Sequence, residues 1–322
     1  MIHRRTAGAV LLAGLVAVFA AAPFVAPNDP WQQFAGHAYA PPMPVRVIDR
    51  GRLRRPFVYP LVLVDRLERR FEEDREHPVA IRFFSGRKLA STPSPEPWLL
   101  LGGDPLGRDV LARLLHGGRA SLGVAGVAVL LTLAIGSIAG AAAGFAGGRA
   151  DRILTTIADF IIVLPMIYVV VTLRATMPLV LEFATVFWTM AVVMALATWP
   201  LPARGVRAIV ATERRKGYAE AAYAAGAGPL RILLRHLLPA AGGHLVTQGF
   251  LLFPAFIFAE ATLSFVGLGF AEPRASWGLM LRDAERVSAI AEAPWLLAPA
   301  AAIVLTLLGV QMSAKSPGQL EP

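Results

Sequence analysis

The chain has 322 residues, of which 56% are hydrophobic, and its mean hydropathy of +0.57 is too high for a water-soluble protein of this length. Only 16% of the residues are charged, and the absence of cysteine excludes disulfide bonds and thiolate metal sites. The net charge of +9 is better explained by positively charged cytoplasmic loops of a membrane protein than by a nucleic-acid partner.

Six segments are long and apolar enough to cross a bilayer, which takes about 20 residues. They are Ala7–Ala26, Ala120–Ala146, Ile153–Leu173, Phe183–Ala203, His244–Val266 and Trp295–Met312. Several contain a proline, which is tolerated in a helix bundle because neighbouring groups satisfy the freed carbonyls. The sequence thus predicts an all-α polytopic membrane protein with six transmembrane helices.

The first of these segments has a second possible interpretation. Residues 1–27 combine a basic start, an apolar middle and small residues near Ala20–Ala22, as a cleaved signal peptide does. Cleavage would leave five spans. Because the apolar run continues through Phe24 and Val25 and is long enough to span, we favour a retained anchor.

Basic residues in the short loops predict the orientation in the membrane. They precede the first span, occupy the turn between the second and third, concentrate between the fourth and fifth, and follow the sixth. These residues are Arg4, Arg5, Arg149, Arg152, Arg204, Arg207, Arg214, Arg215, Lys216, Arg231, Arg235 and Lys315. With six spans they all lie on one face, so both termini are expected in the cytoplasm and residues 28–118 outside.

The external segment is expected to fold as a small α/β unit. In VLVDRLERRFEEDRE, residues 62–76, apolar residues recur at helical spacing between charges, which predicts a helix that ends at Pro78. The run VAIRFF, residues 79–84, predicts a short strand. STPSPEP, residues 91–97, predicts a linker.

The sequence contains no catalytic constellation of the H-E-x-x-H or G-x-S-x-G kind, and we predict no catalytic residue, metal site or cofactor. Residues 309–316 resemble a phosphate-binding P-loop, but alanine replaces its second glycine and an apolar helix precedes it instead of a strand. Lys315 is better explained as a side chain that reaches the membrane interface. The chain itself is therefore not expected to hydrolyse ATP.

Two acids and three glycines inside the spans are candidates for the translocation path or for helix packing. Ionisable groups in hydrocarbon are costly and mark a pathway or a partner, which makes Asp159 and Glu260 candidates. Two alternatives stay open: Asp159 as an interfacial charge paired with a residue such as Arg152, and Glu260 as a helix–helix hydrogen-bond donor or acceptor. Glycines at four-residue spacing clear one face of the second span for close approach of another backbone. They are Gly136, Gly140 and Gly144.

The loop between the fourth and fifth spans carries the most specific pattern. It reads E-A-A, three residues, G, nine residues, H-L-L-P, over residues 220–239. This spacing resembles the E-A-A loop of ABC importer permeases, in which isoleucine usually occupies the histidine position. The resemblance implies a short cytoplasmic helix that docks in a cleft of an ATPase subunit. The residues it assigns to this coupling are Glu220, Ala221, Ala222, Gly226, His236, Leu238, Pro239, Arg204 and Arg207.

Three further segments narrow the resemblance to one group of these permeases, the C subunits of dipeptide/oligopeptide-type importers. DPLGRDVL at residues 104–111 is similar to their entry into the second span, and WPLPARGVR at residues 199–207 to their W-x-x-x-A-R-x-V-R motif. EATLSFVGLG at residues 260–269, followed by SWG, is similar to their E-x-x-L-S-F-L-G-L-G…S-W-G signature. The tail, LLGVQMSAKSPGQLEP, and the long external segment depart from the family pattern.

The resemblance implies the fold of a type I ABC importer permease. In that fold, residues 1–27 form an anchor, residues 28–118 an external segment, residues 119–313 a five-helix core and residues 314–322 a cytoplasmic tail. The coupling loop covers residues 204–243 of the core.

The implied partners are a second, different permease subunit, two ABC ATPase subunits and an extracytoplasmic substrate-binding protein, assembled in the inner membrane. Peptides are the leading substrate, with nickel chelates, glutathione and sugars as alternatives. Two other functions remain open: a proton-coupled secondary transporter that uses Asp159 and Glu260, and a membrane scaffold that holds the external segment. Neither needs an ATPase.

Overall fold

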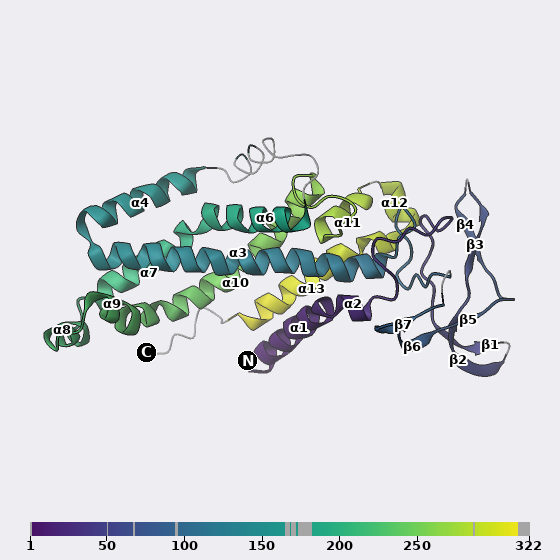
Figure 1. The fold of residues 1–322 in the computed structure, drawn as a ribbon, viewed down its shortest axis with the longest axis horizontal. Helices are drawn as coiled ribbons and strands as arrows, with labels where there is room; N and C mark the ends of the chain where they lie inside the picture. Colours follow the sequence, from purple (N-terminus) through teal and green to yellow (C-terminus); the bar gives the residue numbers. More distant parts are fainter. Residues whose placement is uncertain are drawn as a thin grey trace. The chain divides into compact units, whose positions relative to one another are not determined.

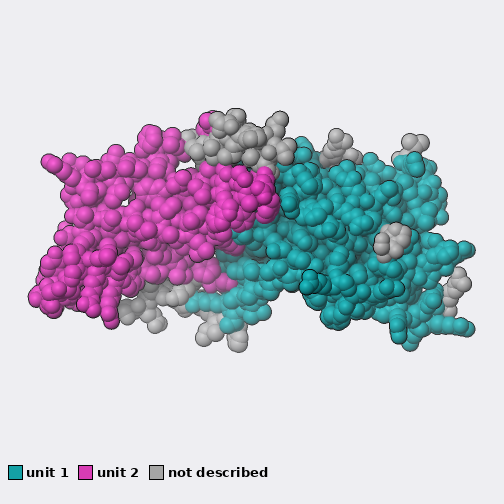
Figure 2. All heavy atoms as spheres, viewed as in Figure 1, with its two compact units in different colours: residues 1–123, 261–312 teal, residues 124–260, 313–322 magenta. Residues whose placement is uncertain are grey.

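The structure is a computed structural model, and it describes residues 2–49, 51–66, 68–93, 96–164, 168, 172, 182–285 and 287–314. The chain divides into two compact units, Met1–Gly123 with Ala261–Met312, and Val124–Glu260 with Ser313–Pro322 (Figure 2). Most of the second half of the expected third span, and the P-loop-like lysine with the rest of the tail, lie outside the described residues.

Helices dominate both units (Figure 1). Those of the first unit are α1 (Ile2–Ala20), α2 (Ala22–Val25), α11 (Trp277–Asp283), α12 (Val287–Glu292), the 3₁₀ turn η3 (Pro294–Leu297) and α13 (Ala298–Ser313). Those of the second unit are α4 (Gly148–Val163), α6 (Phe183–Thr198), α7 (Pro200–Glu213), α8 (Gly217–Ala224), α9 (Pro229–Ile232), η1 (Leu233–Leu237) and η2 (Leu238–Ala241). Two long helices, α3 (Val110–Ala146) and α10 (Gly242–Phe265), contribute to both.

Three helical stretches of the described residues are long and apolar enough to cross a membrane: Val110–Ala146, Pro229–Phe265 and Pro294–Ser313. They contain the expected second and sixth spans and all of the expected fifth span except Val266. The helices α6 and α7 together pass the same test as a fourth span. Residues Arg5–Ala20 form a shorter apolar helix. The count of six spans therefore stays a prediction.

The expected fourth span is bent rather than continuous. Residues 183–203 were expected to form one helix, but α6 ends at Thr198 and α7 starts at Pro200, with 46° between their axes. Pro200 stands at the first position of α7, where its missing N–H is not needed. The bend separates an apolar helix from one that carries the arginines of the WPLPARGVR motif.

Strands replace the helix that the sequence predicts in residues 62–76, and this prediction is wrong. β3 (Leu61–Asp65) and β4 (Arg70–Glu73) form an antiparallel hairpin in which Leu63 faces Phe71. Along β3 every second side chain is half-buried and those between are exposed, which is the two-residue period of a strand. Among the described residues between 46 and 91 there is no helix, so the external segment is a β unit there rather than an α/β unit.

The other strands form two small antiparallel sheets. β1 (Arg46–Asp49), β2 (Arg52–Val58) and β5 (Val79–Ala80) pair in that order, and β6 (Arg82–Ser85) pairs with β7 (Lys88–Ser91). The strand expected over residues 79–84 is thus present as two shorter strands, β5 and β6. A core of apolar side chains lies beneath the strands. It comprises Ala40, Met43, Val58, Ile81, Ala90, Trp98 and Leu99.

Candidate coupling site

The first part of the E-A-A segment is a short helix with one face packed and one face open. In α8, Ala219 is buried and Ala222 half-buried, whereas Glu220 and Ala221 are exposed. Alanine on the packed face lets the helix backbone lie close to its support. The exposed face thus includes the glutamate and the first alanine of the motif.

Gly226 ends this helix in a conformation that only glycine adopts without strain. Its φ is +81°, and its N–H donates to the carbonyl of Tyr223 at 3.0 Å. The N–H of Ala227 donates to the carbonyl of Ala222, also at 3.0 Å. These two bonds form a Schellman motif, which satisfies the last carbonyls of the helix. A Cβ built on Gly226 meets no atom within 4 Å, so backbone conformation, and not space within this chain, requires the glycine.

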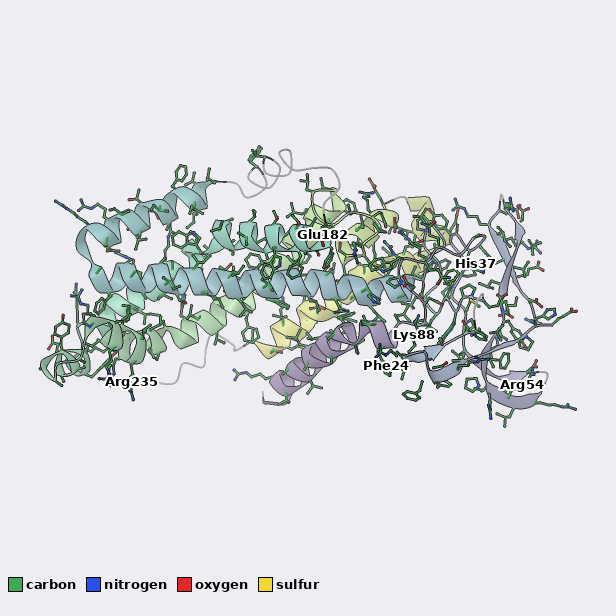
Figure 3. All side chains as sticks on the ribbon, viewed as in Figure 1. Phe24, His37, Arg54, Lys88, Glu182 and Arg235 are labelled. Carbon is green, nitrogen blue, oxygen red and sulfur yellow. The ribbon has the colours of Figure 1, made fainter. Side chains whose placement is uncertain are left out.

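The second part returns the chain to α10 through three different helical geometries. α9 begins at Pro229, η1 is a π-helix, and η2 is a 3₁₀ turn with Pro239 near its start. Ile232 and Leu237 are buried, and Leu238 is half-buried. His236 and Pro239 are exposed, as is Arg235 at the outer surface of this segment (Figure 3).

Both parts of the segment share one apolar core with α7 and the end of α3. The buried members of this coupling core are Ala141, Val206, Val210, Ala219, Ile232, Leu237 and Ala241. Burying the valine, isoleucine and leucine side chains contributes about 1.5–3 kcal/mol each, and the smaller alanines contribute less. α8 and the turn after it are therefore held against the helix that precedes them.

The connector between α7 and α8 is held by polar contacts. Arg214 donates from Nη1 to the carbonyl of Phe145 at the end of α3, and its guanidinium lies 5.2 Å from the centre of the Phe145 ring. Glu213 accepts hydrogen bonds from Lys216 Nζ and from the Tyr218 hydroxyl, each at 2.7 Å. The bond from Lys216, followed by that from Tyr218, holds the pKa of Glu213 below its usual range. Glu213 thus stays ionised and hydrogen-bonded at neutral pH.

Arg204 and Arg207, which the resemblance assigns to coupling, contact α4. Arg204 Nη2 lies 2.6 Å from Asp159 Oδ1, and Arg207 makes two parallel bonds to Asp151, one of them Nη2 to Oδ2 at 2.6 Å. Asp159 is thus paired with Arg204 and not with Arg152, the partner that the sequence suggested. Both pairs are partly exposed, so each contributes about 0–1 kcal/mol.

The three spaced glycines of α3 lie against the backbone of α7. A Cβ on Gly136 would lie 2.9 Å from the Trp199 carbonyl oxygen, just before α7, and one on Gly140 2.3 Å from that of Ala203. One on Gly144 would lie 2.5 Å from the carbonyl oxygen of Arg207. Real Cβ atoms do not approach oxygen so closely. The absence of three side chains therefore allows α3 and α7 to pack backbone to backbone.

The second acid, Glu260, lies in a different environment from Asp159. Its side chain is fully buried within α10, whereas the side chain of Asp159 is more than half exposed. A buried carboxyl group is costly unless it is hydrogen-bonded. Asp159 thus belongs to an exposed ion pair with Arg204, whereas Glu260 lies in the interior.

Comparison with known proteins identifies the chain. The model of the family described as binding-protein-dependent transport system inner membrane component matches residues 133–314, which is more than half of the chain. The chain belongs to this family. Its match includes the coupling core, the glycine face of α3 and the whole E-A-A segment.

Several permeases are similar to this inner membrane component. It is 37% identical over 218 residues to the oligopeptide transport system permease protein OppC of Bacillus subtilis, which covers 67% of this chain and 68% of that protein. It is 35% identical over 230 residues to the di/tripeptide transport system permease protein DppC of Pseudomonas aeruginosa, covering 68% and 72%. It is 39% identical over 191 residues to the dipeptide permease protein DppC of Bacillus subtilis, covering 59% and 57%. It is therefore an ABC permease of the C type.

A buried ionic cluster in the first unit of this inner membrane component was not foreseen from the sequence. Asp104, Arg108 and Arg113 are buried, and both arginines bond to Glu272, with Nη2 atoms 3.0 and 3.1 Å from its Oε1. Arg108 Nε also lies 2.6 Å from Asp104. The DPLGRDVL motif was the available signal, because two of these residues lie in it. The cluster ties the start of α3 to the loop before α11.

The last acid of that motif, Asp109, is fully buried directly before α3. Its Oδ1 accepts from the Leu111 N–H and its Oδ2 from Asn28 Nδ2, each at 2.9 Å. Burial raises the pKa of Asp109 to about 6, against an ordinary value of about 3.9. The folded state then binds this proton more tightly than the unfolded state. Its stabilising effect is complete below about pH 4 and is lost as the pH rises through about 6.

We expect Asp109→Asn to remove this part of the pH dependence, which is on the order of 2–3 kcal/mol between the two protonation states. The thermal midpoint of the detergent-purified protein, compared at about pH 4 and about pH 7, measures it. The wild type should lose more stability than the variant over this interval. Glu96→Gln, at an exposed site of the same segment, is the control and should behave as wild type. Equal pH dependence of Asp109→Asn and wild type would contradict the prediction.

Proposed function

We propose that the chain is the transmembrane permease subunit of an ATP-driven, binding-protein-dependent importer of peptides. In this proposal it forms half of the translocation pore with a second, different permease and binds one of two ATPase subunits through residues 204–243. Family membership supports the general function. The observation that carries the coupling role is the E-A-A segment, which is rigidly supported on one side and open on the other.

The open side has the composition of a protein-binding surface. Tyr223 and Leu230 are 62% and 67% exposed, and Tyr218 and Leu234 are also exposed. Large exposed apolar side chains grouped on one segment mark an interaction site. Arg231, Arg235 and His236 add basic character around them. A cleft with apolar walls and acidic residues at its rim would complement this surface.

The coupling core would connect movement of the ATPases mechanically to the membrane helices. Closure of the ATPases on ATP would displace α8, and α7 would move with it because both belong to the same apolar core. The backbone contact of α7 with α3 would carry the displacement into the membrane. Closure favours one packing of the helices only if the ATPases bind that packing more tightly. Alternating access to the pore follows from this difference in affinity.

The substrate class rests on the relatives. The similar proteins are named as oligopeptide, dipeptide and di/tripeptide transport permeases. Peptides delivered by an extracytoplasmic binding protein are therefore the proposed cargo. A water-filled path between the two permeases, rather than a tight site in this chain, would accept peptides of varied side chains.

Two measurements test the proposal directly. Affinity purification of the tagged chain should recover ATPase subunits and a second permease, and uptake of peptide into vesicles should require ATP. Uptake driven by a proton gradient, with no ATPase recovered, would instead support the transporter that uses Asp159 and Glu260. If neither ATP-dependent uptake nor proton-driven uptake is observed, the scaffold function remains.

The proposed topology has its own test. If the first span is retained, an N-terminal tag stays on the full-length mature chain in the cytoplasm. A reporter fused after Pro27 is then expected outside the cell membrane, because in this topology residues 1–27 cross it once. Loss of the tag from the mature protein would show that the first segment is cleaved and that five spans remain.

A further inference from the structure

The β6–β7 hairpin presents two adjacent aromatic side chains to the outside of the first unit. Phe83 and Phe84 are both exposed, and the exposed fraction of Phe84 is 75%. Phe84 also has a φ of +53°, a conformation rare for a bulky residue. Gly86 and Arg87, the two central residues of the turn, have φ values of +61° and +64°, as a type I′ turn requires. Strained residues of this kind concentrate at functional surfaces.

The hairpin is attached to the end of the first apolar helix. Lys88 Nζ donates to the carbonyl of Pro27 at 2.7 Å, directly after α2. The ring of Phe84 lies 6.4 Å, centre to centre, from that of Phe24 in α2. Figure 3 shows Phe24 and Lys88 close together where α2 meets β6 and β7. The hairpin tip is therefore held at the level where the first helix ends.

Charge is distributed as a lipid interface requires. Arg82 and Arg87 are exposed on either side of the two phenylalanines. Guanidinium groups bind phosphate with two parallel hydrogen bonds, and aromatic side chains are enriched where membrane meets water. Two exposed phenylalanines in β6, with one arginine before them and another in the turn, thus offer contacts for both lipid chains and lipid phosphates.

We infer that the β6–β7 hairpin inserts Phe83 and Phe84 into the outer leaflet of the bilayer, beside the end of the first span. The inference rests on the proposed topology, in which α2 ends at the external surface. Its occupant is the surrounding lipid, because the exposed ring of Phe84 lies beside the exposed ring of Phe24, a residue of the proposed first span. The hairpin would fix the external β segment to the membrane at a second point.

The native chain has no cysteine, so single spin labels can be placed without background. Phe84→Cys is the test position, Leu53→Cys in β2, whose side chain is 84% exposed, is the matched control, and Phe24→Cys is the reference for the end of the span. The assembled transporter is reconstituted in vesicles of phosphatidylethanolamine and phosphatidylglycerol. Collisions of each label with oxygen, which enters lipid, and with a water-soluble nickel chelate are then compared.

The expected result is a ratio of oxygen to nickel collisions well above one at Phe84 and Phe24, and below one at Leu53. A Phe84 label as accessible to nickel as the Leu53 label, with Phe24 in lipid, overturns the hairpin inference alone. Nickel accessibility at Phe24 as well overturns both the inference and the proposed topology. Protection of Phe84 only when the binding protein is added shows a protein contact and also overturns it. Phe83→Cys provides a second position if the first variant does not assemble.

Discussion

Replacing Gly226 by valine is expected to reduce ATP-driven uptake by roughly tenfold or more while the protein still inserts and accumulates in the membrane. A β-branched residue at a φ of +81° is strained by about 1–2 kcal/mol, and the chain relieves that strain by opening the Schellman motif. The end of α8 then turns away from the coupling core. Because the position lies outside the apolar spans, insertion should not change. Uptake into vesicles and recovery of the ATPase subunits measure the effect.

Gly228 offers a matched control in the same turn. It is exposed, a Cβ on it would meet no atom within 4 Å, and its φ of −67° suits any residue. Gly228→Val should therefore keep most of the uptake that Gly226→Val loses. Glu220→Ala should have a milder effect, since an exposed charge contributes about 0–1 kcal/mol. Normal uptake by Gly226→Val at normal expression would remove the coupling role from this segment.

Gly140→Leu is the second substitution for which we expect a large effect. Even the first added carbon would lie 2.3 Å from the carbonyl oxygen of Ala203, so α3 and α7 must separate. Overpacking of this kind costs about 1–3 kcal/mol, and more when backbone rather than a flexible side chain must move. We expect a lower melting temperature in detergent and weaker assembly with the second permease.

Alanine substitutions at this position and at a roomier position of the same helix test the close contact itself. Gly140→Ala should already destabilise the protein, because its Cβ meets the same carbonyl. Gly126→Ala, on the same helix, should not, since its Cβ would lie 4.0 Å from the Phe253 ring, an ordinary contact distance. If the two alanine variants melt at the same temperature as wild type, the glycine face does not pack in the membrane as it does in the structure.

Local chemistry explains which parts of the coupling site could be predicted from the sequence. The end of α8 at Gly226 and the restart at Pro229 follow from residues whose backbone preferences are strong and independent of their surroundings. The apolar runs of α10 and α13 likewise stand out from one sequence. These features need no knowledge of what lies nearby.

Partners distant in the sequence could not be predicted in the same way. The spacing of Gly136, Gly140 and Gly144 shows that something approaches closely, but only the fold identifies it as α7. The sequence suggested Arg152 on the same helix as a partner of Asp159, whereas the structure pairs Asp159 with Arg204 on another helix. The sequence can reveal a small-residue helix face or a charged side chain inside a span. The helix or side chain that it contacts depends on how the helices cross.

The β3–β4 hairpin shows a different limit. Residues 62–76 fit a helical period, but the strand pairs Leu63 with Phe71 and half-buries alternate side chains. The partly buried Leu61 and Phe71 pack on the core that includes Val58 and Leu99. That core is assembled from residues up to about Leu99, far from the hairpin in sequence, and it decided the fold of this stretch against local propensity.

The π-helix at Leu233–Leu237 lets the segment before α10 hold one extra residue without a change in direction. A π turn holds about one more residue than an α turn, whereas each residue of an α-helix advances the direction of its side chains by about 100°. Removing a single residue from η1 and converting it to α-helix would therefore leave α9 and α8 pointing nearly as before. Removing a single residue from α9 would instead rotate α8 by about 100° relative to the following helix. The direction in which the docking surface faces thus tolerates a change of chain length at the π turn but not in the α-helix beside it.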